Sequence, residues 1–360
     1  MRSEIVIGLG YGDEGKGTTV DFLCSRAIKK GHHPIVVRFS GGPQAGHTTY
    51  DYNEYHVHSS FGSGTHKYNI PTFFSKHSLV YPISIQKEMK VFKEVPTLYI
   101  DPLAILITPF DVMANRECSI TMSDGTCGLG IGKAMTRHNE GKFKFYAVDL
   151  LHPKRLYEKM RSYARYYDIN LEDKGLNNEI REFTNAVNTI EWQIKPFMDI
   201  RYEFDLAIFE GSQGILLDKD HGTFPHVTYA NTTSKNAIDI IEEHLLFNSD
   251  TYYVTRAYST RHGNGPFKEE KISVNNSGET NITNDYQGKF KMANIDYDKL
   301  NYAINIDHIY NVASSKHLIV TCLDQMPEDF EFKYKELNTR FKTIYESASP
   351  DSRHFELLKQ

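Results

Sequence analysis

Apolar residues in the first forty positions form two short runs separated by an amphipathic stretch. The runs lie within residues 5–9 and 33–39, and the second contains Ile35-Val36-Val37. Consecutive β-branched residues favour strands, whereas residues 14–30 between the runs have a helical pattern. A strand, a helix and a second buried strand in this order predict a βαβ unit with parallel pairing.

The rest of the chain alternates helical and strand patterns. Residues 151–203 are polar with apolar positions at helical spacing, which predicts helices packed outside the sheet. The later strand signals end in polar or glycine-rich loops and lie at residues 206–209, 252–257 and 317–323. Residues 268–292 lack periodicity, which predicts a mobile loop that closes over a substrate.

These patterns predict an α/β fold: a mostly parallel central sheet with a P-loop-like phosphate site, flanking helices and loop insertions. We find no linker and no internal repeat in the sequence, so residues 1–360 are interpreted as one domain.

Composition narrows the class of protein. The net charge is −5 without a dense basic run, which argues against a surface that binds nucleic acid. The four cysteines include no C-x-x-C pair, which is typical of a reducing cytoplasm without disulfides. No signal peptide or bilayer-length apolar stretch is visible, so we expect a cytoplasmic protein without a membrane partner.

The segment from Gly10 to Thr18, G-Y-G-D-E-G-K-G-T, carries the strongest chemical signal. Its glycines and Lys16 fit a strand–loop–helix cradle, in which backbone N–H groups and a lysine hold a polyphosphate. Two features depart from that pattern: Gly17 stands where Ser or Thr would ligate Mg²⁺, and the loop carries Asp13. A carboxylate beside phosphates suggests a metal ligand or a general base.

Other polar groups follow the predicted strands. His47 lies in a second glycine-rich loop and is a candidate proton donor or oxyanion partner. Gln213 follows the strand at 206–209 and places an amide at the edge of the sheet where ligands bind; a solvated turn is the alternative. His56 and His58 alternate along a strand without a carboxylate at ligand spacing, so we interpret them as structural.

A further glycine-rich run at 123–132, with Arg137 downstream, suits a monophosphate. Glycine loops without a ligand are also common.

Five motifs in the same order resemble the adenylosuccinate synthetase family. They are G-D-E-G-K-G at 12–17, A-G-H-T at 45–48, E-G-S-Q-G-I-L-L-D at 210–218, H-G-T-F-P-H-V-T at 221–228 and S-T-R-H-G-N-G-P-F at 259–267. The resemblance extends to S-P-D-S-R near residue 353. It implies a carbon–nitrogen ligase that joins L-aspartate to C6 of a 6-oxopurine nucleoside monophosphate at the expense of a nucleoside triphosphate.

The resemblance also implies roles for single residues. Asp13 would take the N1 proton, so that O6 attacks the γ-phosphate. His47 would stabilise the transferred phosphate, and Lys16 with Mg²⁺ would offset its charge. Gln213 would contact the purine nucleotide. The other expected contacts are to the phosphate donor (Gly12, Glu14, Gly15, Gly17, Thr18, Asp324, Pro350), to the acceptor nucleotide and aspartate (Gln44, Ser123, Gly125, Thr126, Cys127, Arg137, Thr228, Lys289, Lys291) and to the metal (Asp13, Gly46).

The family also implies a homodimer in which Arg137, with Thr126 and Thr228, holds the nucleotide 5′-phosphate, Arg137 reaching across the two-fold axis.

Departures from the family pattern bear on the substrates. The loop that usually carries arginines reads Q-G-K-F-K at 287–291, which leaves Lys289 and Lys291 as point charges for aspartate.

The usual T-K-x-D motif is Thr321-Cys322-Leu323-Asp324, which favours ATP over GTP as the donor. Q-G-K-F-K at 287–291 and F-G-S-G-T at 61–65 resemble the short virus-encoded branch, which makes 2-aminoadenylosuccinate from dGMP. Members of that branch commonly have Ser where this chain has Asp13, so IMP is the alternative substrate. A virus-encoded enzyme would work in the host cytoplasm.

Two other classes of protein were weighed. A GTPase-like switch would need Ser or Thr after Lys16 and an intact N/T-K-x-D, and the sequence has neither. A binding-only relic of a ligase would not need Asp13, Lys16, His47 and Gln213 together.

Overall fold

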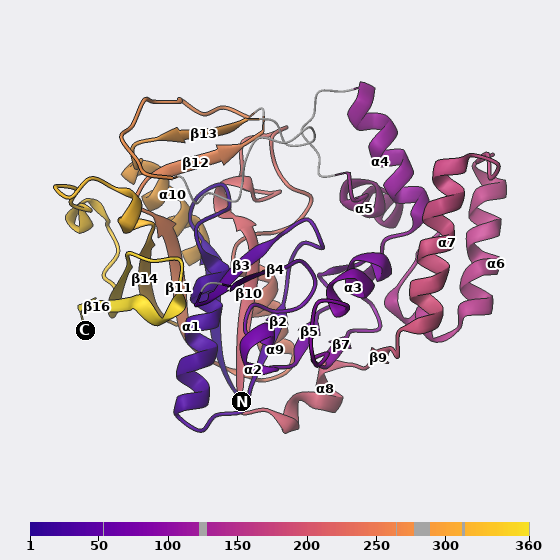
Figure 1. Cartoon of the computed structure of the whole chain (residues 1–360), viewed down its shortest axis with the longest axis horizontal. Helices are drawn as coiled ribbons and strands as arrows, with labels where there is room; N and C mark the ends of the chain where they lie inside the picture. Colours follow the sequence, from indigo (N-terminus) through magenta and orange to yellow (C-terminus); the bar gives the residue numbers. More distant parts are fainter. Residues whose placement is uncertain (53, 122–127, 264, 277–288, 312–313, 360) are drawn as a thin grey trace.

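A single ten-stranded sheet forms the centre of the computed structural model, in the order β16-β15-β14-β11-β1-β10-β2-β5-β7-β9 (Figure 1). The residues that the structure describes are 1–52, 54–121, 128–263, 265–276, 289–311 and 314–359. The strands of the sheet are β1 (Arg2–Gly8), β2 (Pro34–Arg38), β5 (Thr72–Phe74), β7 (Leu98–Ile100), β9 (Gln193–Ile194), β10 (Leu206–Gly214), β11 (Phe247–Arg256), β14 (Ser315–Thr321), β15 (Thr343–Ser347) and β16 (Phe355–Lys359).

Neighbouring strands of this sheet are parallel, except that β16 runs antiparallel to β15. The predicted α/β class with a mostly parallel sheet is confirmed. The expected direct pairing of the first two strands is wrong, because β10 lies between β1 and β2 and pairs with both. The loops after β1, β2 and β10 therefore meet at one edge of the sheet.

Both faces of the sheet are buried, which explains the continuous apolar runs. In β1, Ile5 and Ile7 point into a core that contains α9 (Lys235–Glu243) and α10 (Tyr297–His308), whereas Val6 points into the core beneath α1 (Lys16–Lys29). Helices on opposite faces thus fix the central strands that carry the site.

A second apolar core lies towards one end of the molecule, where helices gather beside β5 and β7 (Figure 1). Helices α6 (Pro153–Tyr166) and α7 (Lys174–Thr189) of the segment predicted as helical lie here, outside the sheet. The rest of that segment differs: residues 193–194 form β9 of the sheet, and α8 (Phe197–Ile200) packs against the core that contains α9 and α10. The remaining helices are α2 (Thr65–Tyr68), α3 (Pro82–Met89), α4 (Pro109–Thr121) and α5 (Ile131–Glu140), with 3₁₀ turns η1 (Ala147–Leu151), η2 (Arg201–Glu203), η3 (Ile215–Leu217), η4 (Leu323–Gln325), η5 (Tyr334–Glu336) and η6 (Ser352–His354).

Three two-stranded sheets complete the described fold. They are β3 (His47–Asp51) with β4 (Glu54–His58), β6 (Leu79–Val80) with β8 (Ile105–Leu106), and β12 (Ser259–His262) with β13 (Phe290–Ala293). The loop predicted at 268–292 is therefore ordered as a strand at its end, while 277–288 lie outside the described residues.

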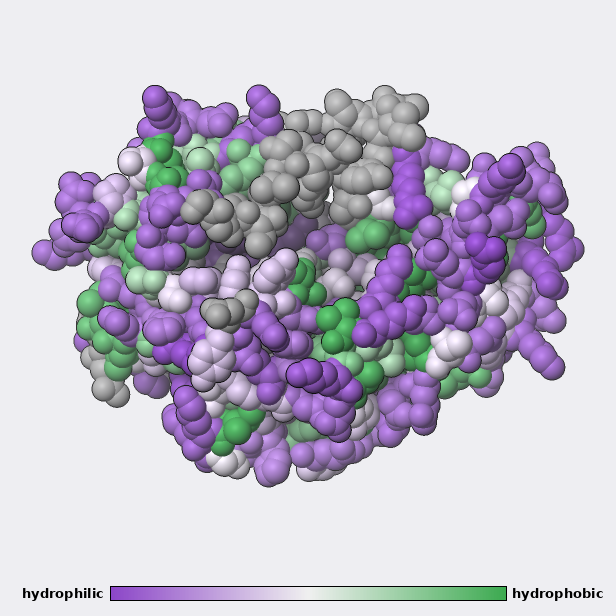
Figure 2. Space-filling model, in the orientation of Figure 1, coloured by the Kyte–Doolittle hydropathy of each residue, from purple (hydrophilic) through white to green (hydrophobic). Residues whose placement is uncertain are grey.

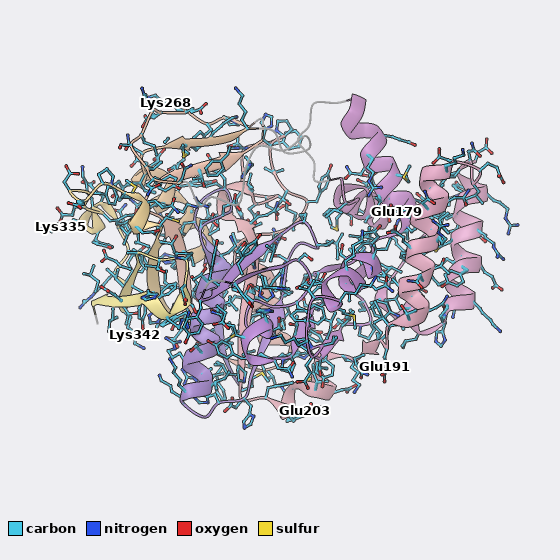
Figure 3. All side chains as sticks on the ribbon, viewed as in Figure 1. Glu179, Glu191, Glu203, Lys268, Lys335 and Lys342 are labelled. Atoms are coloured by element: carbon cyan, nitrogen blue, oxygen red, sulfur yellow. The ribbon has the colours of Figure 1, made fainter. Side chains whose placement is uncertain are left out.

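The surface shown in Figure 2 is mainly hydrophilic, with small separate hydrophobic areas. Figure 3 labels Lys268, Lys335 and Lys342 on the side of β12–β16, and Glu191 and Glu203 at exposed positions of the lower edge; Glu179 lies between helices, where Arg116 Nη1 donates to it at 3.0 Å. Among the described residues, no helix has both the length and the apolar character needed to cross a bilayer.

Candidate functional site

The loop between β1 and α1 is organised around the carboxylate of Glu14. Its Oε1 accepts hydrogen bonds from the backbone N–H groups of Gly10 and Gly12 at 3.0 and 2.8 Å, and its Oε2 accepts one from Lys16 Nζ at 2.6 Å. A Cβ at Gly8 would lie 2.2 Å from Glu14 Oε2, so a glycine is required there. Because the Glu14 side chain faces inward, any contact with a nucleotide has to come from its backbone.

Gly17 explains why the loop departs from the usual phosphate cradle. A Cβ at this position would lie 2.8 Å from the Cβ of His47, closer than side chains tolerate. Strand β3 therefore approaches the first turn of α1 where a Ser or Thr would otherwise stand. Because residue 17 has no side chain, and hence no hydroxyl, His47 can lie beside the loop.

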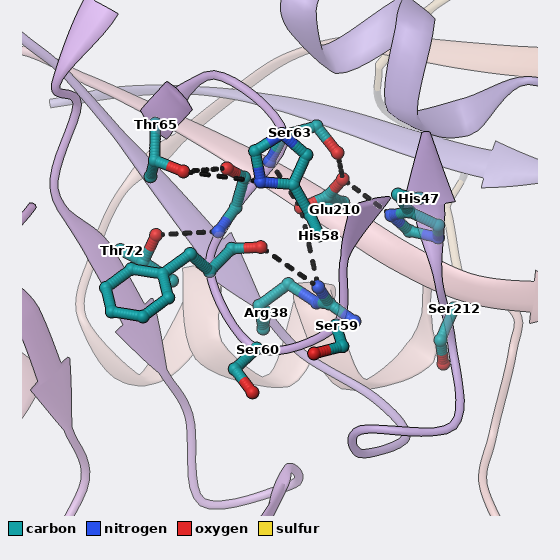
Figure 4. A network of polar contacts seen from close by, with 12 residues as sticks. Arg38, His47, His58, Ser59, Ser60, Ser63, Thr65, Thr72, Glu210 and Ser212 are labelled. Atoms are coloured by element: carbon teal, nitrogen blue, oxygen red, sulfur yellow. Dashed lines mark hydrogen bonds and ion pairs between the residues drawn. The ribbon is translucent and has the colours of Figure 1, made fainter. Parts of the chain in front are cut away.

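His47 belongs to a buried network at the ends of β2, β3 and β10 (Figure 4). Its Nδ1 lies 2.6 Å from Glu210 Oε1, and the backbone N–H of Ser63 donates to Glu210 Oε2 at 3.2 Å. Ser63 Oγ also donates to Glu210, and Arg38 Nη1 lies 3.9 Å from its Oε2. The network fixes the imidazole and leaves Nε2 for another partner.

The electrostatics of the pair favour a neutral imidazole beside an ionised carboxylate. Burial raises the pKa of Glu210, but His47, Arg38 and Ser63 outweigh it and hold that pKa below its usual value. Burial lowers the pKa of His47 more than Glu210 raises it. An anion arriving at Nε2 would raise the pKa of His47 and turn this nitrogen into a donor.

Gln44 and Gln213, from separate segments of the chain, each have a buried side-chain oxygen to which no described residue donates a hydrogen bond. Among the described residues, Oε1 of Gln44 and Oε1 of Gln213 form no hydrogen bond. Gln213 adopts a φ of 55°, and its Cα lies 3.7 Å from the position of a Cβ on Gly12. Buried amide oxygens are normally satisfied, so this pair indicates a ligand between the loops.

Asp13 lies at a strained position with a φ of 63° and faces a cationic neighbourhood. His262 Nε2 of β12 lies 3.4 Å from Asp13 Oδ2, and Arg256 Nε donates to the Asp13 backbone carbonyl. Burial raises the pKa of Asp13, but His262, Arg256 and Lys16 outweigh it and hold that pKa below its usual value. Asp13 is therefore ionised near neutral pH.

An ionised carboxylate suits Mg²⁺, which prefers oxygen ligands. Asp13 offers such an oxygen from the loop, and the other predicted ligand, Gly46, precedes His47 and is exposed. A backbone carbonyl and a carboxylate match the donor set of the metal, so these residues fit the implied ion.

The predicted donor site is continuous with the loop. Thr321 Oγ1, at the end of β14, donates to the Glu14 carbonyl at 2.8 Å, and a Cβ on Gly15 would lie 3.0 Å from Thr321 Cγ2. Asp324 follows in η4, and burial raises its pKa. Thr18 Oγ1 donates to the Pro350 carbonyl at 3.4 Å, which brings together two residues far apart in sequence.

The predicted aspartate site lies beside β12 and β13. Lys291 Nζ donates to the Gly263 carbonyl at 2.8 Å, and Lys289 just before β13 is exposed. Since His262 pairs with Phe290 in this sheet, Lys291 and the Asp13–His262 pair belong to the same small sheet. Gln287 and Gly288 lie outside the described residues.

Arg137 does not have the environment that the resemblance implied. Its side chain is 4% exposed; Nε donates to Asp111 Oδ1 at 2.8 Å and Nη2 donates to Asp111 Oδ2 at 2.9 Å. The remaining donors bind the carbonyls of Leu106 and Phe143. In the single chain the Arg137 guanidinium is thus bound by groups of its own chain, and its expected contact across a dimer stays a prediction.

Thr228 is half-buried, and its backbone N–H donates to the Leu217 carbonyl at 2.8 Å, beyond the end of β10. Four other predicted substrate contacts, Ser123, Gly125, Thr126 and Cys127, lie outside the described residues.

Sequence reasoning missed three residues that the fold brings to these sites. Glu210 opened a recognised motif but was given no role, although its position at a strand end was a usable signal. His262 stood in another motif without a partner in sequence. Glu88 of α3 contacts His56 and His58, so the inference that no carboxylate accompanies these histidines is wrong.

Together the loops after β1, β2 and β10 bring a carboxylate base, a lysine, an oriented imidazole and two unsatisfied amides to one edge of the sheet. This arrangement can remove a proton from a ligand, hold a polyphosphate and stabilise charge on a transferred group.

Comparison with known proteins identifies relatives of the chain. The family model described as adenylosuccinate synthetase matches residues 5–348. An adenylosuccinate synthetase of Coxiella burnetii (strain Dugway 5J108-111) is 31% identical over 284 residues, which cover 74% of this chain and 64% of that protein. The adenylosuccinate synthetase of Xylella fastidiosa (strain M12) is 29% identical over 287 residues, which cover 75% of this chain and 65% of that protein. The aligned part thus spans just under two thirds of these relatives.

Solved structures show the same fold. The fully ligated adenylosuccinate synthetase from Plasmodium falciparum matches with a TM-score of 0.73 at 19% identity, covering 99% of this chain and 86% of that one. The cyanophage S-2L succinoaminodeoxyadenylate synthetase, bound to dGMP and dATP, matches with a TM-score of 0.70 at 15% identity, covering 99% and 95%.

Proposed function

The chain belongs to the adenylosuccinate synthetase family, and we propose that it joins L-aspartate to C6 of a 6-oxopurine nucleoside monophosphate through a 6-phosphoryl intermediate. The observation that carries the proposal is a phosphate-binding loop with an ionised Asp13 that meets Gln213 at Gly12 and His47 at Gly17. A phosphate-binding loop that only stores nucleotide would not hold a carboxylate there, because it repels the phosphates.

In the first step, the Asp13 carboxylate accepts the proton from N1 of the purine. The electron pair released moves to O6, which attacks the γ-phosphorus of the triphosphate, and the nucleoside diphosphate leaves. In the second step, the aspartate amine attacks C6 and loses a proton, the C6–O bond breaks, and phosphate leaves with O6 and carries that proton. Asp13 thereby serves as the general base.

The other residues act on charge and orientation. Lys16 lies within the loop and neutralises the phosphates, while Glu210 directs His47 Nε2 towards the transferred group. Mg²⁺, held by Asp13 and the Gly46 carbonyl, would supply further positive charge. The unsatisfied oxygens of Gln44 and Gln213 are suited to accept hydrogen bonds from purine N–H groups.

We further propose dGMP as the purine nucleotide, with 2-amino-2′-deoxyadenylosuccinate as the product for diaminopurine DNA. The sequence supports this choice because Q-G-K-F-K at 287–291 resembles the virus-encoded branch. A different loop arginine, which in the family approaches the ribose 2′-hydroxyl, is also missing, and its loss weakens the demand for a ribonucleotide. An ionised Asp13 could accept a hydrogen bond from the guanine 2-amino group. The second candidate is IMP, favoured by the presence of Asp13 in place of the Ser common in the viral branch.

For the phosphate donor we propose ATP, since Cys322 replaces the lysine expected before Asp324. We retain a homodimer in the cytoplasm, of the host if the chain is virus-encoded, as part of this proposal. Arg137 remains the residue proposed to reach the partner, and it would have to exchange its contacts with Asp111 for the nucleotide phosphate.

The proposal is tested by incubating the protein with aspartate, Mg²⁺ and either ATP or GTP, together with dGMP, GMP or IMP. We expect a succinylated purine product with dGMP and ATP, detected by liquid chromatography and mass spectrometry. Reaction with IMP alone would refute the choice of dGMP but not the ligase. Triphosphate consumption without any succinylated product would refute the ligase itself.

A further inference from the structure

Two histidines of β4 and a glutamate of α3 form a compact buried cluster outside the proposed ligase site. His56 and His58 alternate with exposed Val57, so both rings point to the same face of the hairpin. Both are buried, and so is Glu88. The hairpin is thereby joined to a helix thirty residues further along the chain.

The three side chains have the spacing of metal ligands. Glu88 Oε1 lies 3.2 Å from His56 Nε2 and 3.7 Å from His58 Nδ1, and all three ligand atoms lie within 4.8 Å of one another. Bonds of about 2.0–2.2 Å to zinc in a tetrahedron place neighbouring ligand atoms about 3.4 Å apart. The distances from Glu88 Oε1 to the two imidazole nitrogens, 3.2 and 3.7 Å, lie on either side of this value, and the two nitrogens lie within 4.8 Å of each other.

The groups around the cluster fix its members in place. Glu88 Oε2 accepts hydrogen bonds from Ser59 N, Ser59 Oγ and Ser60 N at 3.1, 3.0 and 2.6 Å, which leaves Oε1 directed towards the histidines. The other ring nitrogen of His58, Nε2, lies 3.0 Å from Thr49 Oγ1. Partners of this kind hold metal-binding carboxylates and imidazoles in position.

Charge provides an independent reason to expect a cation. Among the described residues, no lysine or arginine forms an ion pair with Glu88, whose side chain is 4% exposed. A neutral imidazole is the form that binds a metal, and a dication would neutralise the buried carboxylate.

We propose that His56, His58 and Glu88 bind one transition-metal dication of the zinc class. Two imidazole nitrogens and one carboxylate oxygen form a set that suits zinc, whereas Mg²⁺ prefers oxygen ligands. His58 pairs with His47 across the hairpin, so the metal would fix the strand that carries the catalytic imidazole. The role of the ion is structural and does not depend on the substrate of the ligase.

The test uses the full chain, freed of any affinity tag, treated with a chelator and then titrated with Zn²⁺ or Co²⁺ in an excess of Mg²⁺. We expect one ion per chain by elemental analysis, a visible absorption spectrum of four-coordinate Co²⁺, and a higher melting temperature with Zn²⁺. Glu88→Gln, which keeps the size of the side chain, should weaken metal affinity by more than the roughly 10- to 100-fold that loss of an outer-shell partner costs, because it removes a direct ligand.

His152→Asn serves as the matched control, because it removes an exposed histidine at the start of α6. It should bind the metal as the unmodified chain does. Failure of the unmodified chain to bind Zn²⁺ or Co²⁺, or equal binding by Glu88→Gln, would overturn the proposal and leave a hydrogen-bonded cluster. If the variant does not fold, the titration of the unmodified chain decides. None of these outcomes depends on ligase activity, so failure of the two proposals can be distinguished.

Discussion

Glu210 determines which nitrogen of His47 is available to a ligand. Its carboxylate oxygen Oε1 lies 2.6 Å from Nδ1, and the backbone N–H and the hydroxyl of Ser63 both donate hydrogen bonds to the carboxylate. The imidazole therefore has one orientation before any substrate arrives. Preorganisation of this kind lowers the cost of stabilising a developing charge.

Glu210→Gln should reduce kcat about 10- to 100-fold with little change in KM, because it removes the charge that supports a protonated His47 while preserving the shape of the network. Steady-state kinetics with the accepted nucleotide measure the effect. Glu203→Gln, at an exposed position on η2, is the control and should leave kcat unchanged. A variant at position 210 with normal kcat would show that His47 needs no such support.

The pH dependence of activity should report the environment of Asp13. A base with a lowered pKa stays ionised to lower pH, so kcat/KM is maintained above that pKa and is lost as pH falls through it. His262→Asn removes one cause of the lowering and should shift the acidic limb of the profile to higher pH. Ionised Asp13 also contributes to the stability of the fold, and this contribution is lost as pH falls through the lowered pKa of Asp13.

The shift is measured as a kcat/KM profile of the variant against the unmodified chain, with the exposed His33→Asn as control. An acidic limb at the same pH in all three proteins would contradict the role assigned to His262.

At the scale of elements, the close approach of α1 and β3 depends on a single missing side chain. Gly17→Ala should lower the free energy of unfolding by about 1–3 kcal/mol, because its Cβ overlaps that of His47. Activity should fall by a larger factor than the loss of folded protein explains, because His47 has to move. Denaturant titration and kinetics on the same preparation separate the two effects.

Gly175→Ala in α7 is the matched control: its Cβ would meet Asp173 Oδ1 at 3.2 Å, far from the site. Unchanged activity in Gly17→Ala would mean that β3 tolerates displacement, and would contradict this explanation of the loop.

The pair of Arg137 and Asp111 ties α5 to α4. Arg137→Met should reduce the free energy of unfolding by about 3–5 kcal/mol, because it leaves the buried Asp111 carboxylate without its partner. Thermal and urea denaturation give the measurement. If stability is unchanged while KM for the nucleotide rises, Arg137 contacts the substrate and its pairing with Asp111 is not its main role.

The elements also show how far the sequence alone could lead. The first loop, α1 and the strands at 206–209 and 317–323 were predictable, because glycine, lysine and β-branched residues define them locally. The insertion of β10 between β1 and β2, the Arg137–Asp111 pair and the contact of Glu88 with two histidines were not. Each depends on pairing between distant segments, which no local pattern specifies.

At the scale of the whole molecule, one parallel sheet brings loops from three parts of the chain to a common edge. The loop after β1 supplies Asp13, the start of β3 supplies His47 and the end of β10 supplies Gln213, while Thr321 at the end of β14 contacts the loop after β1. Helices on both faces bury the strands and hold these ends in register. A reaction with two nucleotides and an amino acid requires such a convergence of separate binding groups.

The proposed intermediate is tested most directly with a purine nucleotide labelled with ¹⁸O at C6. Mass spectrometry of the phosphate released in the presence of aspartate and the triphosphate follows the label. The account predicts that the phosphate carries the label and that the succinylated product has lost it. Unlabelled phosphate released in step with succinylated product would contradict attack by O6 on the γ-phosphorus.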